Sequence, residues 1–165
     1  YLSILFPAFI FPQLKPAIIW PLDSPRVITG NYGELRPNHF HAGLDFSTNG
    51  QVNLQVYAIE EGYVSRVRVS SVGYGKSIYI THRNGRTSLY GHLNAFSLKI
   101  DKIVKEEQYA KKSYEIDFYP KAFSVFVRKN EIIALSGNTG GSSGPHLHFE
   151  IRSGSTLNPC TFVRC

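Results

Sequence analysis

The sequence predicts an all-β fold: a single domain of antiparallel sheets, arranged as a sandwich or barrel with a groove, plus a short helical insertion. The chain of 165 residues contains 14 Gly and 9 Pro, so it turns often and leaves little room for long helices. Hydrophobic residues make up 42% of the chain and charged residues 18%, which excludes a disordered protein. A domain of this length can bury most of its apolar surface without disulfide bonds.

The start of the chain differs from the rest, because it is apolar and interrupted by Pro. Its first apolar run, residues 1–11, is far shorter than the ~20 residues that a membrane-spanning helix needs. The run fits the apolar part of a secretory signal, although a first strand or a hydrophobic strap on the core would look the same. Since the chain contains no Met, we expect an incomplete translation product with a leader, linker or signal remnant at 1–20 and the domain at 21–165.

After a turn-rich stretch that ends near residue 41, short runs of β-forming residues follow one another, each bounded by Gly, Asn or Ser. The predicted strands are 55–59, 63–69, 77–81, 87–90, 132–135 and 147–152. The Asn84-Gly85 pair between two of these strands predicts a hairpin.

Residues 97–129 do not follow this pattern of short strands. The apolar residues Ile100, Ile103 and Val104 have helical spacing, and Lys and Glu supply a solvated face. The alternating residues that follow, as far as Phe118, predict a strand. We therefore expect a compact charged insertion with a short helix and an extra hairpin.

The balance of charge is basic. Eighteen Lys and Arg against twelve Asp and Glu give a net charge of +6 and a pI near 9.4. This surplus favours anionic surroundings, such as nucleic acid, acidic envelope polymers or anionic lipid headgroups. Because the basic residues are scattered along the chain, we expect no nucleic-acid partner.

Two histidines near the end of the chain lie two positions apart in a predicted strand. Side chains at i and i+2 of a strand share one face, so His146 and His148 point the same way, while Leu147 and Phe149 enter the core. Glu150 shares the face of His148, where it either supports that histidine or faces solvent.

A second pair combines His41 with Asp45. In a straight strand their Cα atoms would be about 13 Å apart, so the chain must bend for both to reach one ion. Gly43 lies midway and tolerates such a bend. A His, an Asp and a second His leave one tetrahedral position open for water, which is the pattern of a catalytic zinc site.

These residues also have plainer interpretations. A strand His pair is often exposed, His41 and Asp45 could form an Asx-type turn, and a lone His92 could be an ordinary loop residue. We expect His39, although it forms another His-x-His pair, to be a polar loop residue. His82, after a strand, is expected to be exposed.

Two residues of the loop before His41 have open roles. Asn31 and Arg36 either touch substrate or are ordinary loop residues.

Three segments carry a family resemblance. In chain order they read His41-Ala-Gly-Leu-Asp45, Tyr90-Gly-His92-Leu93 and Ser136-Gly-Asn-Thr-Gly-Gly-Ser-Ser-Gly-Pro-His146-Leu-His148-Phe-Glu. They resemble the three signatures of the lysostaphin/LytM-type zinc endopeptidases, in the family's order, over roughly residues 30–152. Known members of that family cut peptide bonds in bacterial peptidoglycan.

The resemblance implies one zinc ion per chain, bound by His41, Asp45 and His148, and a catalytic pair formed by His92 and His146. A zinc ion lowers the pKa of its water towards ~7 and polarises a carbonyl group. Two further imidazoles can take up the proton and stabilise the developing charge. Which of the two is the base is left open.

The expected function is that of a zinc-dependent endopeptidase acting on peptidoglycan peptides outside the cytoplasm, without a membrane span in the domain. One alternative is a catalytically inactive LytM-like module that binds peptidoglycan or activates another wall hydrolase. A second alternative, a phosphoryl carrier with a His pair, gives Asp45 no role.

In minimal relatives of the family, a short turn joins the Tyr-Gly-His-Leu strand to the next strand. In this chain the predicted insertion stands at that place. Because residues 97–129 follow His92 closely, we predict that they form a wall or lid of the substrate groove. The alternative is a stabilising element or a partner-binding arm.

Overall fold

The computed structural model describes residues 19–163, which form two antiparallel sheets and one α-helix. The strands are β1 Ile28–Gly30, β2 Leu44–Ser47, β3 Gln55–Tyr57, β4 Gly62–Val69, β5 Lys76–His82, β6 Thr87–Leu93, β7 Ala95–Phe96, β8 Ile116–Phe118, β9 Phe126–Val127, β10 Ile132–Leu135, β11 His146–Ser153 and β12 Ser155–Leu157. The helix α1 spans Leu98–Lys111, and a 3₁₀ turn spans Pro159–Thr161. The prediction of an all-β fold with a short helix is therefore confirmed.

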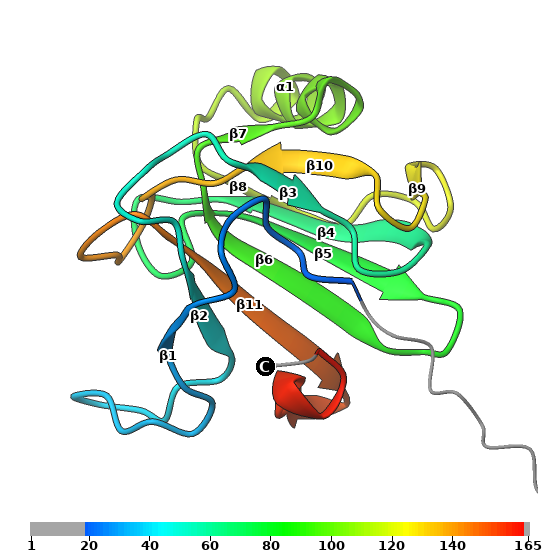
Figure 1. Ribbon diagram of the computed structural model, residues 1–165. Coiled ribbons are helices and arrows are strands. Elements are labelled where there is room, and N and C mark those ends of the chain that lie inside the picture. The colour runs from blue at the N-terminus through cyan, green and yellow to red at the C-terminus, as the bar shows by residue number, and fades with distance from the viewer. Residues whose placement is uncertain (1–18, 164–165) are drawn as a thin grey trace, which may run out of the picture.

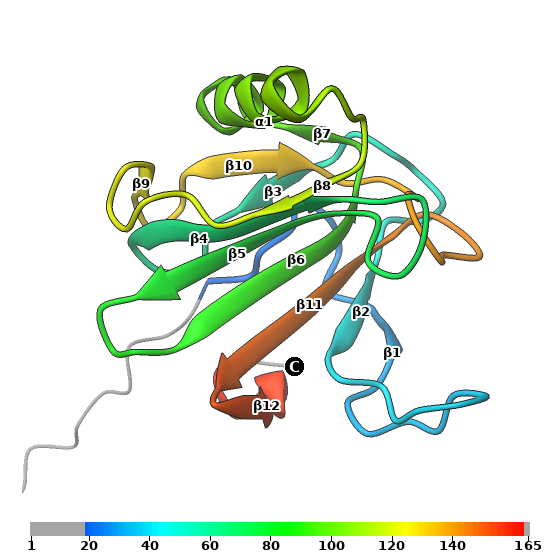
Figure 2. The same ribbon diagram turned by 180° about the vertical axis from the view of Figure 1, so that it is seen from behind.

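The larger sheet has nine strands within the described residues, in the order β1-β2-β11-β6-β5-β4-β8, with β12 pairing to β11 and β9 to β4. Figure 2 shows these strands side by side. The strand β11 comes from the end of the chain and inserts between β2 and β6, so it brings the last motif next to the first two.

The smaller sheet, β3-β10-β7, covers one face of the larger sheet. The helix α1 lies on the far side of the smaller sheet, so the molecule has three layers (Figure 1). Two residues of the helix, Ile100 and Val104, are buried and join the core.

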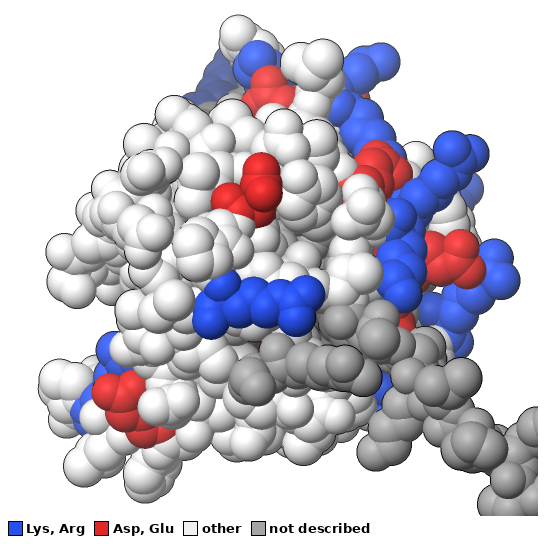
Figure 3. Space-filling view, in the orientation of Figure 1, with Lys and Arg blue, Asp and Glu red and all other residues white. Residues whose placement is uncertain are grey.

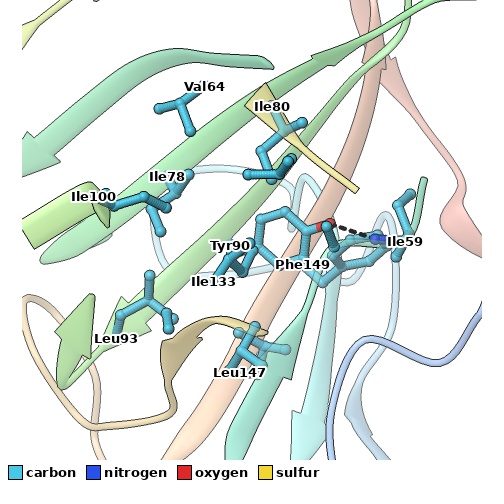
Figure 4. Packing of buried hydrophobic residues seen from close by; sticks show 14 of the residues in the cluster. Ile59, Val64, Ile78, Ile80, Tyr90, Leu93, Ile100, Ile133, Leu147 and Phe149 are labelled. Carbon is cyan, nitrogen blue, oxygen red and sulfur yellow. Dashed lines mark hydrogen bonds between the residues drawn. The ribbon is translucent and has the colours of Figure 1, made fainter. Parts of the chain in front are cut away.

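The core fills the space between the layers with branched aliphatic and aromatic side chains (Figure 4). Leu147 and Phe149 of β11 are fully buried there. Because neighbouring side chains of a strand point to opposite faces, His146 and His148 face away from this core. The predicted division of the strand between its two faces is thus confirmed.

The predicted leader, residues 1–20, lies almost wholly outside the described residues. Its last two residues, Ile19 and Trp20, pack against the core. The Trp20 ring lies 4.3 Å from the ring of Phe46 on β2, so these two residues belong to the packed domain.

Two sequence-based predictions are wrong. The extra hairpin in 97–129 does not form, because β8 and β9 pair with β4 instead of with each other. The strand β1 was missed, since its three residues lie in the turn-rich stretch and are extended only by pairing with β2.

The prediction that His82 is exposed is also wrong, since only 5% of the residue is accessible. Its Nδ1 donates to the carbonyl of Glu61 at 3.0 Å, and its Nε2 contacts Ser88 Oγ at 2.9 Å. Ser88 Oγ in turn donates to Tyr90 Oη, which also accepts the Ile59 N–H at 3.0 Å (Figure 4). A line of hydrogen bonds thus satisfies these four buried groups.

The surface carries few charges over much of the face seen in Figure 3, where Lys and Arg gather mostly along one edge with Asp and Glu among them. No helix in the described part of the chain is long and apolar enough to cross a membrane.

The hydroxyl group of Tyr90 provides a test of the core. We expect Tyr90→Phe to lower the free energy of unfolding by about 1–3 kcal/mol, because the Ile59 N–H loses its acceptor in a dry environment. Urea unfolding measures this change. The control is Tyr57→Phe, whose hydroxyl donates to Gln55 at the surface and should be nearly neutral. Equal stability of the two variants would contradict the assignment.

Candidate metal centre

Three side chains meet where β11 lies beside β2. His148 on β11 is paired directly with Asp45 on β2, while Gly91 of β6 lies on its other side. His41 lies in the loop that leads into β2. All three side chains are almost completely buried.

Their ligand atoms form a small triangle. His41 Nε2 lies 3.0 Å from His148 Nδ1 and 3.1 Å from Asp45 Oδ1, and His148 Nδ1 lies 3.0 Å from Asp45 Oδ1. Ligands placed about 2.0–2.2 Å from a tetrahedral zinc ion are separated by about 3.3–3.6 Å. The triangle therefore needs little change to hold such an ion.

The other nitrogen of each imidazole is already occupied. His41 Nδ1 lies 2.8 Å from the carbonyl oxygen of Asn31, and His148 Nε2 lies 2.9 Å from Glu150 Oε1. Oxygen atoms of carbonyls and carboxylates only accept, so each of these nitrogens donates its proton outward. The inner nitrogens, His41 Nε2 and His148 Nδ1, are thereby directed at the Asp45 carboxylate, an arrangement that a cation bound among them stabilises.

Glu150 is fully buried, so of its two predicted settings the one beside His148 is correct. Burial by itself would raise the pKa of its carboxyl. The hydrogen bonds from His148, Arg152 and Tyr74 outweigh that effect and lower the pKa to about 2. Glu150 is therefore a carboxylate at neutral pH and accepts the His148 proton.

Asp45 is held as an anion in the same way. Burial favours its protonated form, but hydrogen bonds with His146, His148 and His41 bring its pKa well below the usual range. Its second oxygen, Oδ2, accepts a hydrogen bond from Arg36 Nη2 at 2.9 Å. Only Oδ1 is thus directed at the triangle.

The chain bends at Gly43, between His41 and Asp45, as predicted, and the glycine has a second role there. A Cβ atom added there would lie 2.2 Å from the carbonyl oxygen of Phe149 on β11. The glycine therefore lets the chain before β2 lie close against β11.

The two remaining histidines of the motifs lie beside the triangle. The rings of His92 and His146 are 4.6 Å apart, and His146 Nε2 is 3.5 Å from Asp45 Oδ1. Each Nδ1 is directed at a carbonyl oxygen, that of Thr139 at 2.7 Å for His92 and that of Gly144 at 2.8 Å for His146. Each Nδ1 therefore donates its proton to a carbonyl.

His92 has two unusual properties. Its backbone is left-handed, with φ of 57°, which is uncommon for a residue other than Gly. Burial lowers its pKa to about 4, so the ring is neutral at pH 7 and able to accept a proton. Strained backbone of this kind is concentrated at functional sites.

A cavity of about 490 Å³ lies over these residues. Its walls are formed by three loop segments and the five histidine and aspartate side chains described above; the lining residues are Arg36, Pro37, His39, His41, Asp45, Gly73, Tyr74, His92, Gly141, Ser142, Ser143, His146 and His148. The predicted insertion 97–129 contributes none of them, so the prediction that it forms a wall of this cavity is wrong.

The loop 136–145, rich in Gly and Ser, is tied to the loop before β5 and to the first residue of that strand. Gly141 N donates to the Gly73 carbonyl at 2.8 Å, and Lys76 N donates to Thr139 Oγ1 at 2.9 Å. Two loops that are far apart in the sequence thus brace each other at the edge of the cavity.

Of the other residues considered from sequence, His39 is exposed, lines the cavity and lies outside the triangle, as expected for a polar loop residue. Asn31 holds His41 through its carbonyl, and Arg36 holds Asp45. Sequence reasoning missed Tyr74, which sits in a Gly-Tyr-Gly turn that resembles an ordinary hairpin.

Comparisons with known proteins agree with this geometry. Residues 39–112 and 122–159, more than half of the chain, match the family model described as "Peptidase family M23". The unmatched residues between them lie within the predicted insertion.

Among curated proteins, the chain is 32% identical over 120 residues to the DD-carboxypeptidase/endopeptidase Mpg of Neisseria meningitidis, covering 72% of this chain and 22% of that protein. It is 30% identical over 111 residues to lysostaphin of Staphylococcus simulans, covering 67% of this chain and 17% of lysostaphin. The chain thus spans about a fifth of the length of these relatives.

Among solved structures, a zinc containing peptidase from Vibrio cholerae superposes with a TM-score of 0.63 at 26% identity, covering 84% of this chain and 37% of that chain. The fold, the order of the three motifs and the family match agree, and the resemblance seen in the sequence is confirmed. This chain belongs to peptidase family M23.

Proposed function

We propose that the chain is a zinc-dependent endopeptidase that hydrolyses peptide bonds in peptidoglycan, in cross-links or stem peptides, outside the cytoplasm. The observation that carries this proposal is the meeting of three metal-binding side chains with two further imidazoles in one cavity. The names of Mpg and lysostaphin support a peptide-hydrolysing role, and the net charge of +6 suits an anionic envelope.

The zinc ion would be held by His41 Nε2, Asp45 Oδ1 and His148 Nδ1. When bound, it supplies a Lewis acid that activates water and polarises the scissile carbonyl. The protein itself fixes the protons of the site: carbonyl or carboxylate acceptors hold the outer nitrogen of each ring.

His92 and His146 would share the transfer of the proton and the binding of the developing negative charge. Both rings present Nε2 to the cavity, and the low pKa of His92 keeps its lone pair available at neutral pH. A catalytically inactive wall-binding module has no need of these two residues. Their presence together with all three ligands therefore favours the enzyme.

Removal of one ligand tests the metal site. We expect the wild-type protein to bind one zinc ion per chain. The variant His148→Ala should lose it, because only two of the three protein ligands remain. Elemental analysis after dialysis measures the metal content. His39→Ala is the matched control, since His39 lines the same cavity outside the triangle and should leave one zinc ion bound. A wild-type protein without stoichiometric zinc would refute the proposal.

Substitution of His92 should separate zinc binding from peptide-bond cleavage. We expect His92→Ala to retain zinc and to cleave defined muropeptides at least ~100-fold more slowly, because a general base or oxyanion partner is missing. Mass analysis of the fragments, with and without chelator, measures cleavage, and His39→Ala again serves as the control. Unchanged cleavage by His92→Ala would remove that residue from the mechanism.

The carboxylate behind His148 should set the affinity for zinc. We expect Glu150→Gln to weaken zinc binding by about 10–100-fold, because the amide no longer provides a charged acceptor for the His148 proton. Competition with a chelator of known affinity measures the effect. Glu131→Gln, which alters a carboxylate bound to the Arg128 N–H far from the site, is the control. Equal affinities in the two variants would be evidence against the role of Glu150.

A further inference from the structure

We infer that Tyr74 is a positioning residue: it fixes the orientation of His148, both directly and through Glu150, and thereby strengthens zinc binding. The inference rests on the metal site of the proposed function. It concerns a residue that neither touches the ion nor belongs to any of the three motifs.

Tyr74 contacts His148 and the carboxylate behind it at the same time. Its ring stacks on the His148 ring, with centroids 4.9 Å apart and an angle of 28° between the planes. Its hydroxyl donates to Glu150 Oε1 at 2.5 Å, the same oxygen that accepts the His148 proton. The stack limits rotation of the imidazole, and the hydrogen bond fixes its acceptor.

The hydroxyl is the donor in this contact, because a carboxylate only accepts hydrogen bonds. Arg152 Nε binds the other carboxylate oxygen of Glu150 at 2.6 Å. Glu150 is therefore held from both ends, and removal of Tyr74 Oη leaves a fully buried carboxylate with one donor fewer.

The backbone of Tyr74 is fixed as firmly as its side chain. Its carbonyl accepts the N–H of His92 at 2.8 Å, so the same residue also holds the end of β6 where His92 has its left-handed backbone. Tyr74 and His148 both pack beside Gly91, where an added Cβ would lie 3.5 Å from each. The loop that carries Tyr74 is also held by the insertion, because Glu115 accepts the N–H of Ser71 at 2.7 Å.

Variants of Tyr74 test the inference through metal affinity instead of activity. The metal-free protein is titrated with zinc against a competing chelator, and the visible spectrum of the Co²⁺-substituted protein reports the ligand geometry. We expect Tyr74→Phe to raise the zinc Kd by about 3–10-fold, less than the 10–100-fold typical of a residue that contacts a ligand directly. Tyr74→Leu, which also loses the stack, should raise it further, and both should shift the Co²⁺ bands.

The control is Tyr79→Phe. Tyr79 is a buried tyrosine whose ring lies near the guanidinium groups of Arg66 and Arg152. The substitution keeps this ring and removes only the hydroxyl, so the zinc Kd of the variant should stay within about twofold of the wild-type value. In the double variant Tyr74→Phe/Glu150→Gln, the loss should be smaller than the product of the two single losses, because both act through one hydrogen bond. Thermal unfolding verifies that each variant is folded.

An unchanged zinc Kd and Co²⁺ spectrum in Tyr74→Phe would overturn the inference, as would losses that simply multiply in the double variant. If Tyr74→Phe does not fold, 3-fluorotyrosine placed at position 74 keeps the ring and changes only the donor strength; an unchanged Kd then overturns the inference and a shifted Kd supports it. A wild-type protein that binds no zinc would refute the proposed function itself. Zinc binding that does not depend on Tyr74 would refute only this inference.

Discussion

The candidate site depends on the register of one strand. Since β11 pairs with β2 so that His148 lies opposite Asp45, and with β6 so that Gly91 lies on its other side, the ligands meet without long or flexible side chains. A shift of one residue would turn His146 and His148 into the core and Leu147 and Phe149 to the outer face. The packing that holds Phe149 in the core is therefore also what holds the ligand geometry.

A second principle is that each imidazole is oriented by an acceptor behind it. Main-chain carbonyls hold His41, His92 and His146, while His148, which lies between two strands, is held by the buried carboxylate of Glu150. This leaves the other nitrogen of each ring free of that acceptor. The arrangement explains how several histidines crowd around one carboxylate without competing for protons.

Much of the fold could be predicted because its signals are local. Alternation of side chains located the longer strands, and the Asn84-Gly85 pair located a hairpin whose Gly85 has φ of 77°. The alternation that ends at Phe118 located β8, but the short strands β1 and β9 could not be predicted, because two or three residues are extended only when a neighbouring strand supplies their hydrogen bonds. For the same reason the insertion was taken for a hairpin, although β8 and β9 both extend the sheet at β4.

The sequence by itself determined which residue types could bind a metal and which of them share a strand face, because motif spacing and the two-residue period of a strand are properties of neighbouring positions. Only the tertiary structure decided which ring nitrogen points inward, that His82 is buried, and that Tyr74 supports Glu150 from 76 positions away. Contacts of that kind depend on which strands lie side by side. No local pattern encodes them, since either partner alone resembles an ordinary loop or surface residue.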